Sequence, residues 1–71
     1  MKTYRKIATV KAKIFNSGDE DGFEGSIPYI STLENQKFYG AFEKNYLCVG
    51  IDGERWLVEK SIFERTYEEI K

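Results

Sequence analysis

A chain of 71 residues with a net charge of −1 has room for one hydrophobic core and carries no strong field of either sign. Its single cysteine, Cys48, and its lack of histidine exclude an internal disulfide and leave no nitrogen and sulfur ligand set for zinc. Five phenylalanines, five tyrosines and one tryptophan supply the apolar area that so short a chain needs. We expect residues 1–71 to form a single domain in a reducing cytoplasm.

The N-terminal residues are basic, but no apolar stretch long enough for a signal peptide or a membrane span follows them. We therefore expect no membrane partner. Residues 4–15 show the period of two that is typical of a half-buried strand. One face of the predicted strand is apolar, with Ala8, Val10, Ala12 and Ile14. The opposite face holds Thr9, Lys11 and Lys13.

Residues 16–22 are polar and punctuated by glycine, so they predict a loop. The acids that follow one another here have the oxygen density that a hard cation prefers. An EF-hand alignment fails, because Pro28 would take the twelfth position when Gly22 takes the sixth. We expect no bound metal, although a metal-dependent enzyme using Asp19, Asp21 and Glu24 is a third alternative.

Three further strands are predicted over residues 27–33, 37–42 and 46–51. Turns separate them at residues 34–36 and 43–45, where Asn35 tolerates a positive φ. Gly40 interrupts the second of these strands and indicates a bulge or a close backbone approach. Cys48, within the third, is interpreted as a small core residue.

Asp52-Gly53 is the clearest local signal, because it separates a strand from residues 54–58. Such a pair is typical of a two-residue type I′ turn, in which both positions have positive φ. We therefore predict a β-hairpin. Trp56 is interpreted as the core anchor of this hairpin, with an exposed interface residue as the alternative.

Near the C-terminus, Ser61 and Glu64 have the spacing of a helix capping box. Phe63, Tyr67 and Ile70 would line one side of the turns that follow. So short a helix is marginal in isolation, so we expect a single helical turn near residues 61–65. The residues after it are either helical or extended and paired with the N-terminal strand.

The predicted elements add up to a mainly β fold. We expect either a small, strongly bent antiparallel sheet or an SH3-like barrel of about five strands, with a short C-terminal helical turn.

The closing stretch at residues 62–68, Ile-Phe-Glu-Arg-Thr-Tyr-Glu, resembles a family of short bacteriophage and prophage proteins that often carry a Pro-Gly-Asp-Tyr-Gly-like stretch. Residues 4–6, 32–35, 45–50 and 53–54 extend the resemblance to about three quarters of the chain. This sequence departs from the family where Glu43-Lys44-Asn45 replaces Pro-Gly-Asp. The resemblance implies a phage-type origin and a compact β-rich fold, and it implies no activity.

No catalytic arrangement emerges from the sequence. Nucleophilic catalysis needs a base that titrates near neutrality, and the chain has no histidine. The glycines of the acidic loop are not followed by the lysine and hydroxyl residue of a phosphate-binding loop. We expect a non-enzymatic protein without a cofactor.

The candidate binding surface combines basic and aromatic residues: Lys11, Lys13, Phe38, Tyr39 and Tyr46. These residue types would suit a weak single-stranded nucleic-acid-binding module, which neutralises phosphates and stacks bases. A short chain also needs its aromatic residues for its own core, and the acids nearly cancel the bases. We therefore expect an accessory protein that binds a host or phage protein in the host cytoplasm, as a monomer or small homo-oligomer, with nucleic-acid binding as the alternative.

Overall fold

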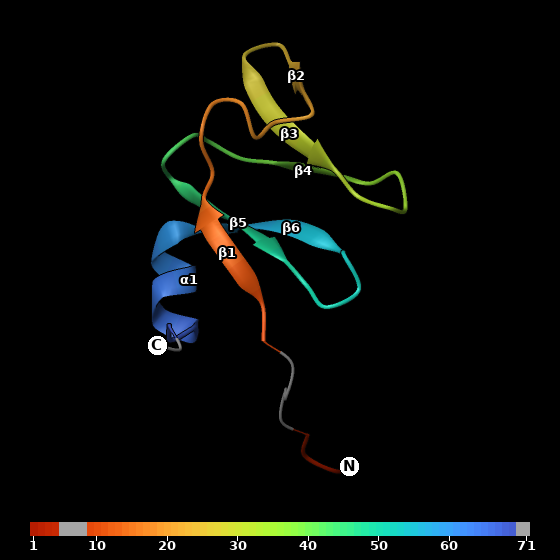
Figure 1. Cartoon of the computed structure of the whole chain (residues 1–71), viewed down its shortest axis with the longest axis vertical. Coiled ribbons are helices and arrows are strands. Elements are labelled where there is room, and N and C mark those ends of the chain that lie inside the picture. The colour runs from red at the N-terminus through yellow and green to blue at the C-terminus, as the bar shows by residue number, and fades with distance from the viewer. Residues whose placement is uncertain (5–8, 70–71) are drawn as a thin grey trace.

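The computed structural model describes residues 1–4 and 9–69. Six strands and one helix follow one another along the chain: β1 (Lys11–Ile14), β2 (Gly22–Glu24), β3 (Ile27–Ser31), β4 (Lys37–Tyr39), β5 (Asn45–Val49), β6 (Arg55–Glu59) and α1 (Lys60–Thr66). The strands form two antiparallel sheets, a first sheet in the order β1-β5-β6 and a second in the order β2-β3-β4. Figure 1 shows the two sheets one above the other, with α1 beside the first.

The predicted mainly β fold with a short C-terminal helix is confirmed. The described residues form two separate three-stranded sheets and no closed barrel, so the barrel alternative is wrong. No helix within the described ranges is long and apolar enough to cross a membrane.

The first sheet has two unlike faces. Lys11 lies opposite Val49 and Lys13 opposite Leu47, so these four side chains share one face, which we call the inner face. Leu57, opposite Leu47 on β6, belongs to it as well. The other face, which we call the outer face, contains Ala12, Ile14, Tyr46, Cys48, Trp56 and Val58.

The hydrophobic core lies between the inner face and the second sheet. Phe15, Ile30 and Leu47 are its buried members. Phe38, Phe42 and Leu57 pack against them. The second sheet reaches this core through contacts of β3 and β4 with β6, whereas β1 contacts β5 alone among the described elements. The inner face is therefore covered at β6 and open at β1.

This arrangement corrects the prediction for the first strand. Ala12 is exposed and Ile14 only half-buried, so the apolar set expected to be buried is not the one on the core side. The reason is that β1 is an edge strand, and neither of its faces is covered by the second sheet. The strand is also shorter than predicted, and residues 5–8 of the predicted span lie outside the described residues.

The acidic loop is shorter than predicted, because β2 follows it and pairs with β3. Gly22 lies opposite Tyr29, and a Cβ on Gly22 would come within 2.5 Å of the Tyr29 hydroxyl oxygen. The missing Cβ of Gly22 therefore lets the tyrosine ring lie across β2. A three-residue strand that begins with glycine gives no periodic signal, which is why the sequence did not predict it.

Gly40 confirms the predicted close backbone approach. A Cβ at this position would lie 2.8 Å from Cδ1 of Leu57 in the other sheet. The Gly40 N–H donates to the Pro28 carbonyl oxygen at 3.2 Å, which extends the contact between β3 and the segment after β4. A side chain here would have to displace the Leu57 side chain.

The predicted hairpin between β5 and β6 is confirmed, but its turn differs. The Gly50 N–H donates to the Glu54 carbonyl oxygen at 2.8 Å, which leaves a three-residue loop. Gly53 has a φ of 83°, and Asp52 is not among the non-glycine residues with positive φ. The predicted two-residue type I′ turn is therefore wrong, and the geometry is that of a three-residue loop ending in a glycine bulge. Asn35 has a φ of 60°, which confirms its predicted role in the earlier turn.

Helix α1 begins directly after β6 and is longer than the single predicted turn. Its N-terminal cap is Glu59, without a side-chain capping hydrogen bond, so the predicted Ser61 capping box is wrong. The Lys60 N–H instead donates to the Lys44 carbonyl oxygen at 3.0 Å. The rings of Phe63 and Tyr67 stack on each other, although Tyr67 is the extended C-cap residue just after the helix. Ile70 lies outside the described residues, and β1 pairs with β5 rather than with a C-terminal strand.

Candidate functional site

The five predicted surface residues lie in four different places. Lys11 and Lys13 project from the inner face of the first sheet, and Tyr46 lies on its outer face. Phe38 packs against the core, whereas Tyr39, the next residue of β4, points away from it. The structure therefore brings together only the two lysines, and it separates the aromatic residues from them and from one another.

Tyr46 belongs to a stack of three rings that fastens α1 to the first sheet. Its ring lies 4.1 Å from that of Phe63, which lies 4.6 Å from that of Tyr67. The Tyr46 hydroxyl donates to the Glu64 carboxylate at 3.2 Å. Burial, together with the neighbouring Glu64 carboxylate, raises the pKa of Tyr46 above its ordinary value of 10.0. The ring and the hydroxyl of Tyr46 both contact other residues of the protein, so Tyr46 has a structural role.

The exposed side of the second sheet carries a compact group that we call the tyrosine face: Tyr29, Lys37 and Tyr39. Tyr29 and Tyr39 lie opposite each other, with ring centroids 5.8 Å apart in an edge-to-face arrangement. The Lys37 ammonium nitrogen lies 4.6 Å from the Tyr29 ring centroid. Tyr39 remains 47% exposed. The group therefore offers ordered aromatic surface beside a positive charge.

Sequence reasoning misses Tyr29, which it places only in a strand. Lys37 stands next to Phe38 and Tyr39 in the sequence, but the sequence gives no register between the two strands. Positions 29, 37 and 39 fall on one face only because Tyr29 pairs with Tyr39. Alternation along each strand is visible in the sequence, but the offset between two strands is set by the turn. Here that turn holds Asn35 in a left-handed conformation, which the sequence does indicate.

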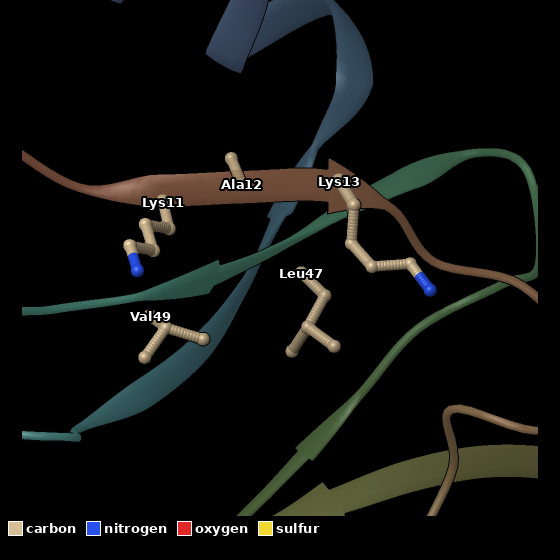
Figure 2. Close-up of a pocket in the computed structure, with 5 residues that line it drawn as sticks. All are labelled: Lys11, Ala12, Lys13, Leu47 and Val49. Atoms are coloured by element: carbon tan, nitrogen blue, oxygen red, sulfur yellow. The ribbon is translucent and has the colours of Figure 1, made fainter.

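On the other sheet, the open end of the inner face forms a shallow hollow of about 250 Å³ lined by Lys11, Ala12, Lys13, Leu47 and Val49. Figure 2 shows the Lys11 and Lys13 side chains extending to the same side of the sheet as Leu47 and Val49, with Ala12 pointing to the opposite side. We call this the lysine hollow. It combines an aliphatic floor with two ammonium groups.

The two lysines of the hollow differ in their partners. The Lys13 ammonium group lies 2.9 Å from Oδ1 of Asp19 in an exposed ion pair. Lys11 is exposed and forms no ion pair with the residues that the structure describes. An exposed ion pair contributes only about 0–1 kcal/mol, so an incoming carboxylate can compete for Lys13. The hollow is therefore positively charged at its edge.

The acids of the polar loop are engaged within the protein. Asp19 accepts from the backbone N–H of Asn16 at 2.9 Å as well as from Lys13. The hydrogen bond from the Asn16 N–H, reinforced by Lys13, lowers the pKa of the Asp19 carboxyl below its ordinary value of 3.8. The Glu20 carboxylate accepts from the Gly18 N–H at 2.7 Å. Within residues 1–4 and 9–69, no group of three or more acidic, cysteine or histidine side chains is placed to hold a metal ion.

Asp21 joins the two sheets through Arg55 of β6. Oδ2 of Asp21 accepts from the Ser31 N–H at 2.7 Å and from Arg55 Nη2 at 2.6 Å. The same Arg55 nitrogen donates to the Ser31 carbonyl oxygen at 2.8 Å. The Ser31 hydrogen bond and the Arg55 charge outweigh partial desolvation and lower the pKa of Asp21 below 3.8. We refer to these three residues as the Arg55 clamp.

Cys48 is fully buried, which confirms its interpretation as a small core residue. Trp56 is half-buried on the outer face of the first sheet, between the two alternatives that the sequence left open. Neither residue contributes to the tyrosine face or to the lysine hollow.

Comparison of the chain with known protein families, with curated proteins and with solved structures finds no match. The functional argument consequently rests on the two surfaces described above.

Proposed function

We propose that the chain is a non-enzymatic accessory protein that binds another protein through the tyrosine face. The observation that supports this proposal is the pair of half-buried Tyr29 and exposed Tyr39 on a sheet face with no element over it among the described residues. Tyrosine is enriched at protein interfaces because its ring buries a large area while its hydroxyl still forms hydrogen bonds.

The tyrosine face is ordered before any partner arrives. The Tyr29 ring lies across Gly22 and beneath the Lys37 ammonium group, so its rotamer is fixed by neighbours on both adjacent strands. A side chain that is already fixed loses little conformational entropy on binding. Ile27, 51% exposed on the same face, adds apolar area next to the tyrosines. These features support a protein partner.

The setting of this interaction is proposed from the sequence. The resemblance to short phage and prophage proteins supports a partner of phage or host origin in the host cytoplasm. The engagement of Tyr46, Asp19 and Asp21 in internal contacts supports a binding rather than a catalytic role.

Site-specific photo-crosslinking tests the proposal. A photoreactive phenylalanine analogue placed at Tyr39 should yield a discrete crosslinked partner in the host. The matched control carries the analogue at Ile51, which is exposed at the tip of the β5–β6 hairpin, and should yield none. No product from position 39, or the same products from both positions, would contradict the proposal.

A single-stranded nucleic acid is the second candidate partner. The observation that favours it is Lys37 beside two tyrosines, because aromatic stacking and a nearby cation together bind single strands. The five residues predicted for this role are not gathered on one face, which leaves Tyr39 alone of that set on the tyrosine face.

Fluorescence anisotropy separates the two candidates. A labelled oligothymidylate should bind with an affinity that falls as salt rises, and Tyr39→Ala should remove binding, if the partner is nucleic acid. Absence of binding at low salt would eliminate this candidate and leave the protein partner.

A further inference from the structure

The free edge of β1 is a second surface that the tyrosine face does not explain. β1 ends the strand order of the first sheet and contacts β5 alone among the described elements. An uncovered edge strand presents backbone donors and acceptors that another extended segment can pair with.

The hydrogen-bond pattern shows which residues of β1 face the free edge. The Phe15 N–H donates to the Asn45 carbonyl oxygen at 2.9 Å, so Phe15 directs its backbone groups toward β5. Antiparallel pairing alternates this direction at each residue. Lys13 and Lys11 therefore bond to β5, whereas Ala12 and Ile14 direct their N–H and C=O groups to the open side.

The side chains along this edge would select the segment that pairs with it. On the inner face the edge presents Lys11 and Lys13 beside the aliphatic floor of Leu47 and Val49. On the outer face it presents Ala12, which is exposed, and the half-buried Ile14. An added strand would thus meet two cations on one face and two small or aliphatic side chains on the other.

We propose that the β1 edge binds an extended acidic segment of a partner protein, added antiparallel as a fourth strand of the first sheet. Acidic residues at alternate positions lie opposite Lys11 and Lys13, with their methylene groups over the lysine hollow. Aliphatic residues at the intervening positions lie beside Ala12 and Ile14. Opposite charges directly across two strands stabilise the pairing, and the backbone hydrogen bonds supply the rest.

A second copy of this chain is a poor occupant of the same edge. Two β1 strands paired with each other would bring lysines against lysines, and lysines on edge strands commonly prevent such self-association. That role does not account for the aliphatic floor between the two lysines. The charge of the edge therefore favours an acidic partner over a homodimer.

A designed peptide tests the inference directly. A fluorescein-labelled peptide of about eight residues, in which glutamate alternates with valine, should bind the whole chain and raise its anisotropy. The matching peptide with lysine in place of glutamate should not bind. In an isotope-labelled sample, the amide signals of Ala12 and Ile14 should shift more than those of Tyr29 and Tyr39.

Backbone methylation distinguishes strand addition from mere charge attraction. In the proposed register the valine N–H groups face β1 and the glutamate N–H groups face solvent. N-methylation of the valines should therefore remove binding, whereas N-methylation of the glutamates should preserve it. Equal affinity of the two methylated peptides would overturn the proposal.

Charge reversal on the protein provides the matched variants. Lys11→Glu leaves the Lys13–Asp19 ion pair in place and should weaken binding about tenfold, because one attraction becomes a repulsion. Lys60→Glu, which changes an equally charged exposed residue at the start of α1, should leave the affinity unchanged. Equal losses in the two variants, or no binding by the original peptide, would contradict the inference.

Analytical ultracentrifugation and chemical crosslinking measure whether the chain forms dimers. Dimers of the chain whose formation shifts the amide signals of Ala12 and Ile14 would assign the edge to a second copy and overturn the proposal. The inference concerns the first sheet only, so crosslinks from Tyr39 can fail while the peptide binds, or persist while it does not. The two proposals are therefore tested separately.

Discussion

The two sheets have the same number of strands but differ in what covers them. On the outer face of the first sheet, the Tyr46 ring stacks on Phe63 of α1, which in turn stacks on Tyr67 just after the helix. The tyrosine face of the second sheet has no such cover among the described elements, and its rings contact each other, Lys37 and the Gly22 backbone. Two aromatic groups in one small chain thus differ: one fastens a helix, and the other is the surface that we propose binds a partner.

The sheets depend on each other where their inner faces meet, at Ile30 of β3 and Leu47 of β5. Ile30→Ala should lower the free energy of unfolding by about 2–5 kcal/mol, because Ile30 is fully buried and its truncation leaves a cavity in the core. Chemical denaturation followed by circular dichroism measures the loss. Leu33→Ala, at an exposed turn residue, should change the free energy of unfolding by less than about 0.5 kcal/mol.

Independent unfolding would break this comparison. If Ile30→Ala unfolded the second sheet while α1 and the first sheet kept their signal, the sheets would not share one core.

The spacing between the sheets is set at Gly40. Gly40→Ala should destabilise the protein by about 1–3 kcal/mol, because its Cβ would lie within 2.8 Å of Leu57 Cδ1. Thermal denaturation of this variant, beside Ser26→Ala in the exposed turn between β2 and β3, measures the effect. Equal melting temperatures would show that the two sheets have room to move apart.

The Arg55 clamp should make the stability of the contact between the two sheets depend on pH in the acid range. The folded-state pKa of Asp21 lies below its ordinary value of 3.8, so the contribution of the Asp21 carboxylate to folding stability is complete above pH 3.8. The contribution is lost as the pH falls from about 4 toward the lowered pKa. Asp21→Asn should lower the free energy of unfolding by about 1–2 kcal/mol at neutral pH. This value is reduced for the partial exposure of the Asp21–Arg55 pair.

Urea denaturation at pH 7 and pH 3 checks this prediction. Wild type and Asp21→Asn should differ less at pH 3 than at pH 7, whereas Glu24→Gln should follow wild type at both. A constant difference between the two pH values would show that the carboxylate charge is unimportant.

Local structure could be predicted where one or two residues determine the backbone. Gly53 and Asn35 identified two reversals, and Gly40 identified a close approach, because each position needs a conformation or a space that few residues permit. The type of the hairpin turn could not be obtained in this way. It depends on the pairing of Gly50 with Glu54, which lengthens the loop by one residue.

Long-range contacts account for most of what the sequence did not reveal. Nothing near Asp21 in the sequence indicates that Arg55, 34 positions away, will neutralise it. Tyr39 and Tyr46 are equally aromatic and both lie in strands, yet α1 covers one and leaves the other exposed. The candidate surface was therefore chosen by residue type, and only the packing of the elements separates its members.

Nitration of the native protein by tetranitromethane, followed by peptide mass spectrometry, tests the difference between the two sheets most directly. Tyr39 should react well before Tyr46, because Tyr39 is exposed while Tyr46 lies in the ring stack with its hydroxyl bonded to Glu64. Equal rates at the two tyrosines, or faster reaction at Tyr46, would contradict the account.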